Sequence, residues 1–313
     1  MIGFLATRGL RLFAVLVVVS FLAQLLIELL PGDPTTAILG LQASPEARAQ
    51  LHSDLGLDQD PVSRYFSWVA AAAQGDLGTS ISWGTPVTDT ILERLPITLE
   101  LLGWSILLAL LIAVPLAVLT ADRPNAWTNR IAAVSSLTLI STPVFILGVL
   151  LAGVVGLKLG WVDVSGYVGW DGGPGPHLQS LALPAVTLAL GQVAMYYRML
   201  QSDLLRTLRE DYLLLARTRG FGRQRILWVH ALRPSLTSLL TVLGLTIGSL
   251  IGGAVIIESI FGIPGLGRLL INASLARDFV MVQGVVLVIG LTYVVVNLTV
   301  DFLYAAFDPR IRL

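Results

Sequence analysis

Long apolar runs are the feature that most restricts what this sequence can fold into. A helix of about 20 apolar residues matches the hydrocarbon core of a bilayer, and every backbone polar group inside that core needs a partner within the protein. We therefore expect an all-α integral membrane protein with six transmembrane helices and no separate soluble domain. The six runs cover residues 12–30, 101–120, 131–157, 181–200, 236–257 and 280–307.

The composition agrees with a membrane protein and excludes several functions. Hydrophobic residues make up 55% of the chain and charged residues 13%, and the mean hydropathy is +0.80. The net charge of zero gives no indication of nucleic-acid binding. Cysteine is absent and the three histidines are widely separated in the sequence, so we expect no metal site. The single lysine, Lys158, does not fit a phosphate-binding loop. We expect no enzymatic activity and no cofactor in this chain.

The distribution of arginines predicts the orientation, because cytoplasmic loops carry the excess of basic residues. Residues 198–234 hold eight arginines, and the tail 308–313 adds two more. Six helices then place both termini in the cytoplasm and the acidic segment 31–96 outside. The predicted organisation is an N-terminal membrane helix over 1–30, an extracytoplasmic cap over 31–96, a five-helix core over 97–307 and the cytoplasmic tail. The first run lacks a small-residue cleavage site and is interpreted as a retained helix.

The predicted cap has local signals of folded structure. The Ser-Pro-Glu sequence at 44–46 is typical of a helix start, with serine as the cap and proline in the first turn. Residues 61–74 favour a second helix, and residues 75–80 favour a turn. The apolar face expected for the second helix comprises Val62, Tyr65, Phe66 and Val69.

A short helix over 211–220 is predicted within the basic segment. Acidic residues precede it, Arg217 and Arg219 lie near its end, and Gly220 is suited to a left-handed C-terminal cap. A helix of this length is marginal alone and needs a surface to pack against. The arginines either only set the topology or belong to a helix that inserts into a groove of a partner. An amphipathic stretch over 226–232 follows, and an interfacial structural role is expected for its histidine, His230.

Two further groups have open interpretations. Gly244, Gly248 and Gly252 recur every four residues, next to Gly253, and form a face that permits close helix packing. This face serves either packing within the chain or a subunit interface or pathway wall. Acidic residues near the predicted membrane boundaries, and amides within the spans, are assigned mainly structural roles. The acidic residues are Glu28, Glu100, Glu258 and Asp301.

The motif D-Y-x-x-x-A-R-x-x-G at 211–220, followed by H-A-L-R at 230–233, resembles the coupling segment of ABC importer permeases. The likeness is nearest to the dipeptide, oligopeptide and nickel branch. The general motif has Glu-Ala-Ala where this chain has Leu-Leu-Ala, and Arg233 interrupts its final Leu-Pro pair. Other matching motifs are L-L-P-G-D-P at 29–34, L-G-L-D at 55–58, G-D-L-G-T-S at 75–80, R-L-P-I-T-L-E-L at 94–101, E-x-x-F-x-x-P-G-L-G at 258–267 and D-x-x-Y-A-x-x-D-P-R at 301–310.

The resemblance implies a type I importer permease in the plasma (inner) membrane of a prokaryote. It implies peptide import by alternating access, a homologous second permease subunit, two ATPase subunits that bind ATP and magnesium, and an extracytoplasmic substrate-binding protein. Nickel chelates or another small solute are alternative cargoes, and an ion-gradient-driven transporter is the alternative class. Bilayer lipid is the remaining partner. The residues implied in ATPase coupling are Glu210, Asp211, Tyr212, Ala216, Arg217, Arg219 and Gly220.

Overall fold

The computed structural model describes residues 2–25, 35, 39–40, 43–54, 58–124 and 126–307. These residues form helices joined by turns, with one isolated bridge between Thr79 and Pro86. The helices are α1 (Ile2–Leu25), α3 (Pro45–Asp54), α4 (Pro61–Ala72), α5 (Val87–Asp122), α6 (Trp127–Ser141), α7 (Val144–Leu151), the π-helix η1 (Ala152–Lys158), the 3₁₀ turn η2 (Trp170–Gly172), α8 (Pro174–Thr207), α9 (Asp211–Thr218), α10 (Arg223–Arg225), the π-helix η3 (Ile226–Ala231), α11 (Leu232–Ile260), α12 (Leu266–Leu275) and α13 (Phe279–Phe307).

The structure confirms some of the six predicted membrane-spanning helices. Within the described residues, four helical stretches are long and apolar enough to cross a bilayer: Val87–Asp122, Pro174–Thr207, Arg223–Ile260 and Phe279–Val300. A bent helix pair would make a fifth. The first predicted span is described only to Leu25, and its apolar part there, Ala14–Leu25, is shorter. The helical membrane fold is therefore established, and the count of six remains a prediction.

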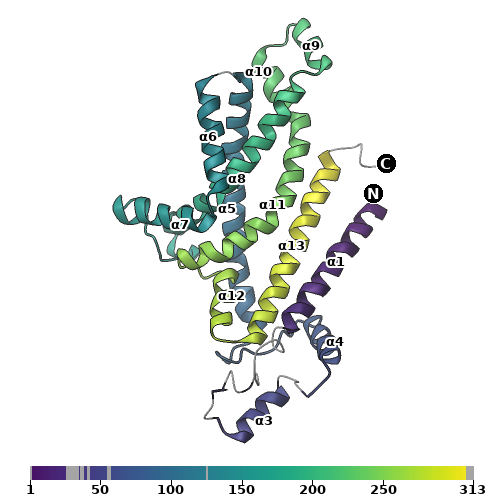
Figure 1. The fold of residues 1–313 in the computed structure, drawn as a ribbon, viewed down its shortest axis with the longest axis vertical. Coiled ribbons are helices and arrows are strands. Elements are labelled where there is room, and N and C mark those ends of the chain that lie inside the picture. The colour runs from purple at the N-terminus through teal and green to yellow at the C-terminus, as the bar shows by residue number, and fades with distance from the viewer. Residues whose placement is uncertain are drawn as a thin grey trace. The chain divides into compact units, whose positions relative to one another are not determined.

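The expected continuous helix over 131–157 is wrong in one respect, because the chain turns sharply in its middle. Trp127–Ser141 and Val144–Lys158 meet at 105°, and Figure 1 shows α7 turned away from α6. The cause is local: Pro143 restricts the preceding residue, and Thr142 adopts an extended conformation with φ −93° and ψ 119°. Pro184, by contrast, lies inside α8 without ending it.

The described chain divides into two compact units, the first of which comprises residues 2–98 and 264–294. Its core combines residues from the α4–α5 connection, α5, α12 and α13, including Leu77, Ile91, Leu266 and Met281. Asp278 is fully buried and accepts hydrogen bonds from the Ser80 hydroxyl and from the backbone N–H of Ser82 at 3.1 Å. This carboxylate ties the turn after α4 to the start of α13.

The two helices predicted in the cap segment are confirmed. Ser44 caps α3 by accepting a 3.1 Å hydrogen bond from the N–H of Ala47. The face predicted for α4 needs correction, because Tyr65 is 6% exposed whereas Phe66 is 65% exposed. The reason is tertiary: the Tyr65 hydroxyl lies 2.7 Å from that of Ser20 on α1, and α4 contacts α1 through this residue. Val62 and Val69 are also exposed.

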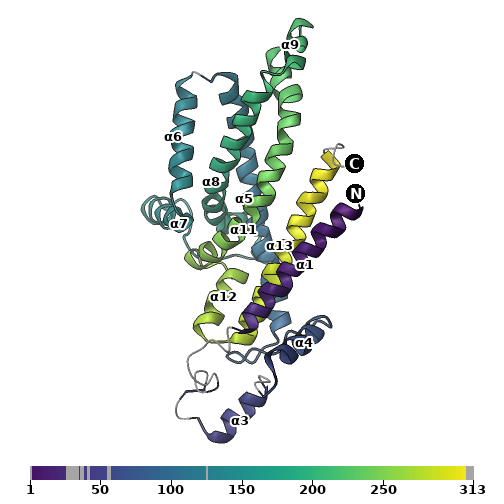
Figure 2. The same cartoon turned by 45° about the vertical axis from the view of Figure 1, so that its right-hand side comes forward.

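The second unit comprises residues 99–263 and the end of α13. Its core is built by α5, α6, α8 and α11, and small residues such as Ala109, Ala113 and Ala117 let α5 pack closely. The same core continues into α9 and η3 through Leu213 and Ile226. Figures 1 and 2 both place α9 beyond the ends of α8 and α11. The unit thus carries a short helix at one end of a membrane bundle.

Candidate functional site

Helix α9 forms where the sequence predicts it, over Asp211–Thr218. Asp211 lies in its first turn and Arg217 in its last, which complements the helix dipole. Glu210 occupies the N-cap position but makes no side-chain cap hydrogen bond. The predicted cap at Gly220 is confirmed: φ is +81°, and the N–H of Phe221 donates to the carbonyl of Ala216 at 3.2 Å. This bond and that from Gly220 to Arg217 define a Schellman motif.

The two faces of α9 have different environments. Leu213 and Ala216 are buried in the core of the unit. Tyr212, Leu214 and Leu215 are 46%, 48% and 59% exposed. Ala216, which the family resemblance implies in ATPase coupling, faces inward, where it lets α9 approach the chain's own core. The outward face is instead apolar, and Arg217 and Arg219 are exposed beside it.

The surface that receives α9 is the π-helix η3, which continues without interruption into α11. Ile226, Leu227 and Ala231 of η3 are buried in the same core, whereas Trp228 and Val229 are exposed, as the predicted amphipathic pattern requires. The Tyr212 hydroxyl donates to the carbonyl of His230 at 3.3 Å. Burial, followed by the negative charge of Glu210, raises the pKa of Tyr212 above its ordinary value. The sequence indicated an amphipathic stretch here, but not its π-helical geometry.

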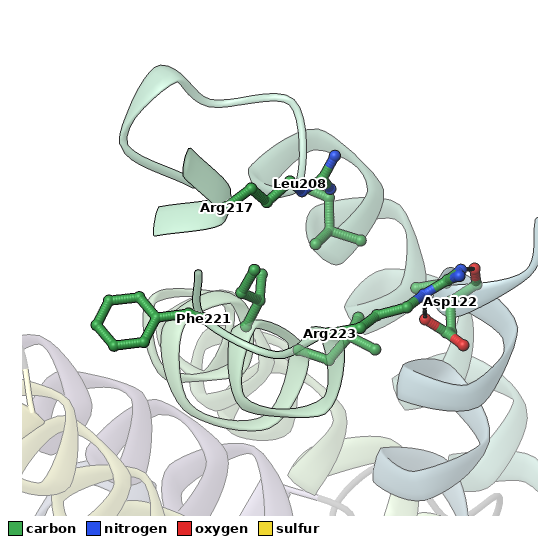
Figure 3. A pocket seen from close by; sticks show the side chains of 8 residues that line it. Asp122, Leu208, Arg217, Phe221 and Arg223 are labelled. Carbon is green, nitrogen blue, oxygen red and sulfur yellow. Dashed lines mark hydrogen bonds and ion pairs between the residues drawn. The ribbon is translucent and has the colours of Figure 1, made fainter. Parts of the chain in front are cut away.

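A hollow of about 440 Å³ separates the end of α9 from α5. Arg217 and Leu208 lie on one side, as Figure 3 shows, and Arg223 reaches Asp122 on the other. Arg223 donates to both the carboxylate and the backbone carbonyl of Asp122. Phe221 lies at the edge of the hollow, and Ala121, Ile226 and Leu227 complete its lining.

A second, more open hollow of about 480 Å³ is lined by the two acidic residues of the predicted coupling segment. Glu210 and Asp211 line it together with Arg206 and Arg209 from the end of α8 and the connection that follows. Arg206 is paired with Asp203 at 2.7 Å. The predicted coupling residues are thus brought to one end of the bundle, although they face different surroundings.

The glycines of α11 do not share one environment. Gly253 is buried, and a Cβ there would meet Leu188 of α8 at 3.3 Å. A Cβ on Gly244 would meet Val300 of α13 at 3.2 Å. Gly248 and Gly252 are exposed. Packing within the chain therefore accounts for Gly244 and Gly253, and the other two lie on an open face.

One polar cluster was not found from the sequence, because its members are far apart in the chain. His177 is fully buried, with Nδ1 2.7 Å from the carbonyl of Val168 and Nε2 2.8 Å from Oε1 of Glu100. Trp170 stacks on the imidazole with ring centroids 4.1 Å apart. Outside the membrane helices, burial and the charges of Glu100 and Asp171 raise the pKa of Tyr167. Together these contacts fasten the connection before α8 to α5.

This geometry defines a class: a helical membrane bundle that displays a short two-faced helix at one end. Comparisons with known proteins identify the family. Residues 113–313 match the model of the binding-protein-dependent transport system inner membrane component, and residues 1–102 match the model of its N-terminal region. The chain belongs to this family, the ABC importer permeases, and is a multi-pass membrane protein.

Full-length relatives agree with the branch that the motifs indicated. A putative peptide transport system permease protein of Brucella abortus (strain 2308) is 39% identical over 314 residues, covering 100% of this chain and 99% of the relative. The glutathione transport system permease protein GsiC of Escherichia coli O6:H1 is 34% identical over 312 residues, with the same coverage. The predicted resemblance to the peptide branch is confirmed.

Proposed function

We propose that this chain is the membrane permease subunit of an ATP-driven peptide importer that works by alternating access. Separate ATPase subunits bind ATP and magnesium and perform the hydrolysis. A homologous second permease subunit completes the pathway, and an extracytoplasmic binding protein delivers the substrate. The names of the relatives, which match over the whole chain, support a peptide or a glutathione-like peptide as cargo.

The observation that carries this proposal is the two-faced character of α9. Its inner face, with Leu213 and Ala216, is anchored in the permease core. Its outer face exposes two leucines in succession, Leu214 and Leu215, at the end of the bundle. Leu215 also lies three residues after the exposed Tyr212, and exposed apolar side chains at this helical spacing suit insertion into an apolar groove. The flanking arginines are available for charge contacts at the rim of such a groove.

The proposed topology follows from the same basic segment. Residues 198–234 face the cytosol, the cap over 31–96 lies outside, and six spans place both termini inside. This arrangement puts α9 on the side where ATP is present. The core over 97–307 carries the pathway, and the first helix over 1–30 and the tail 308–313 flank it.

The open face of α11 is proposed to meet the second permease subunit or the substrate pathway. It includes Gly248 and Gly252, and the nearby side chain of Leu245 is 77% exposed. Small residues on an exposed membrane helix allow another helix or a solute to approach the backbone.

The test is uptake of labelled peptides by proteoliposomes that contain the chain, its second permease and its ATPases. Uptake should require ATP and the ATPase subunits. Uptake by the chain without ATPases, driven by an ion gradient, would refute the proposal. For the docking face, Leu215→Asp should abolish co-purification of the ATPases. Leu275→Asp, at a leucine on α12 that is 80% exposed against 59% for Leu215, is the control and should leave the complex assembled.

A further inference from the structure

We propose that α9 and η3 move as one body, in which Tyr212 and Phe221 hold α9 to His230 and pass its displacement into α11 rather than into α5. The inference rests on the proposed function and identifies the positioning residues of the coupling site. Three observations carry it: the attachment of both ends of α9, the hollow on its α5 side, and the π geometry of the receiving segment.

Both ends of α9 converge on the same residue of η3. At its start, the Tyr212 hydroxyl donates to the carbonyl of His230. After its end, the reversal at Gly220 brings the Phe221 ring onto the His230 ring, with centroids 5.2 Å apart and planes inclined by 34°. The Arg225 guanidinium lies 5.0 Å from the centroid of Phe221. A helix attached at two points cannot pivot about either of them.

The middle of α9 adds a packed contact to these two attachments. Leu213 and Ala216 are buried in one cluster with Ile226, Leu227 and Ala231. Close-packed side chains transmit displacement because the interior has little free volume to compress. A push on the outer face of α9 is therefore delivered to η3.

The α5 side is attached to α9 less directly. Leu213 and Ala216 share their buried cluster with Val118 and Ala121 of α5, but within the described residues no hydrogen bond or ring contact joins α9 to α5. The hollow of about 440 Å³ lies between Arg217 and the end of α5.

Beside the hollow, Arg223 pairs with Asp122, and this ion pair joins α5 to α10 and not to α9. The Arg223 side chain is 68% exposed and the Asp122 side chain 14% exposed, so this ion pair fastens α10 to α5 at the rim of the hollow. If α9 moved toward α5, the hollow between them would narrow first, and α5 would not yet be displaced.

The continuity of the π-helix η3 with α11 determines which membrane helix receives the displacement. Residues Ile226–Ala231 lead directly into α11, so a shift of η3 changes the position of that helix. π-helical turns are uncommon and frequently accompany functional sites. α11 packs against α7 and α8 and carries the exposed glycines Gly248 and Gly252. The structure thus connects the docking helix to the open face of α11 by a single continuous helix.

Distance measurements on the assembled importer test the inference, and the absence of native cysteine allows labels at chosen positions. One pair joins Thr218→Cys on α9 to Val229→Cys on η3, and the other joins Thr218→Cys to Arg123→Cys beyond α5. Between the nucleotide-free and ATP-trapped complexes, the first separation should stay constant and the second should shift by about 1–2 Å or more. A change in the first separation, or constancy of both, would overturn the inference.

Functional variants provide a second readout. Phe221→Leu removes the ring contact with His230 and leaves the exposed face of α9 unchanged, so it should leave ATPase co-purification and ATP hydrolysis intact while lowering peptide uptake per ATP hydrolysed. Asp122→Asn removes the charge of the α5 link and should leave that ratio unchanged. An unchanged ratio in Phe221→Leu, or an equal loss in Asp122→Asn, would refute the proposed route through η3 and leave the proposed function standing. If no ATPase associates with the wild-type chain, the proposed function itself fails.

Discussion

Nε2 of His177 lies 2.8 Å from Oε1 of Glu100, and this contact requires a proton between the two side chains. The carbonyl of Val168 can only accept, so Nδ1 of His177 carries a hydrogen. Nε2 then either donates to a carboxylate or accepts from a protonated carboxyl group. In both cases the buried imidazole has two satisfied nitrogens, and the connection before α8 is held by a shared proton.

Removing the Glu100 side chain should loosen that connection. Glu100→Ala leaves Nε2 of His177 without its partner, at a cost of about 1–3 kcal/mol for a buried polar group. Glu100→Gln should cost less, because the amide can donate to Nε2. Hydrogen exchange in nanodiscs should show faster exchange over residues 161–173 in Glu100→Ala than in Glu100→Gln. Equal exchange in the two variants would contradict the shared proton.

Leu213 and Leu215 provide a matched pair on α9. Leu213 is fully buried in the core, so Leu213→Ala should destabilise the chain by about 2–5 kcal/mol. Leu215→Ala, at an exposed position, should change stability by no more than about 0.5 kcal/mol. Thermal unfolding in detergent measures both effects. On the proposed function, Leu215→Ala should instead weaken ATPase binding, and the opposite pattern would mean that the faces of α9 are reversed.

Gly220 and Gly222 provide a second pair, which separates backbone strain from side-chain bulk. A Cβ at either position meets no atom within 4 Å, but only Gly220 has a positive φ. Gly220→Ala should therefore cost about 1–2 kcal/mol and increase hydrogen exchange in α9. Gly222 has a φ of −62°, so Gly222→Ala should behave like the wild type. In the importer, Gly220→Val should reduce transport without preventing membrane insertion.

The raised pKa of Tyr212 predicts a measurable titration. Its pKa lies above the ordinary value of 10.0. The Tyr212 hydroxyl is therefore still mostly protonated at pH 10, and its hydrogen bond to His230 is lost as the pH rises through the folded-state pKa. The difference between the phenolate absorbance of the wild type and that of Tyr212→Phe should appear above pH 10. A difference that titrates at or below pH 10 would show that the hydroxyl is freely solvated.

Features set by neighbouring residues in the chain were predictable, and features set by distant contacts were not. The caps at Ser44 and Gly220 depend on a few adjacent residues, and both agree with prediction. The buried side of α4 depends on Ser20 of α1, which no periodicity within α4 reveals. Likewise, the inward position of Ala216 depends on η3, and the pairing of Glu100 with His177 spans 77 residues. The motif over 211–220 indicated where the candidate site lies, and packing determined which of its side chains face outward.

The π-helix η3 has a consequence for how sequences related to this one can diverge. Each residue of an α-helix turns the chain by about 100°, so one further residue inserted within the π-helix Ile226–Ala231 would rotate everything before it relative to α11. Such a rotation would carry Phe221 away from His230 and lift Leu213 out of its core. The length of this stretch is therefore constrained more strongly than the identity of its exposed residues. A related permease with an insertion in this stretch should have a helix equivalent to α9 that packs differently against the equivalent of η3.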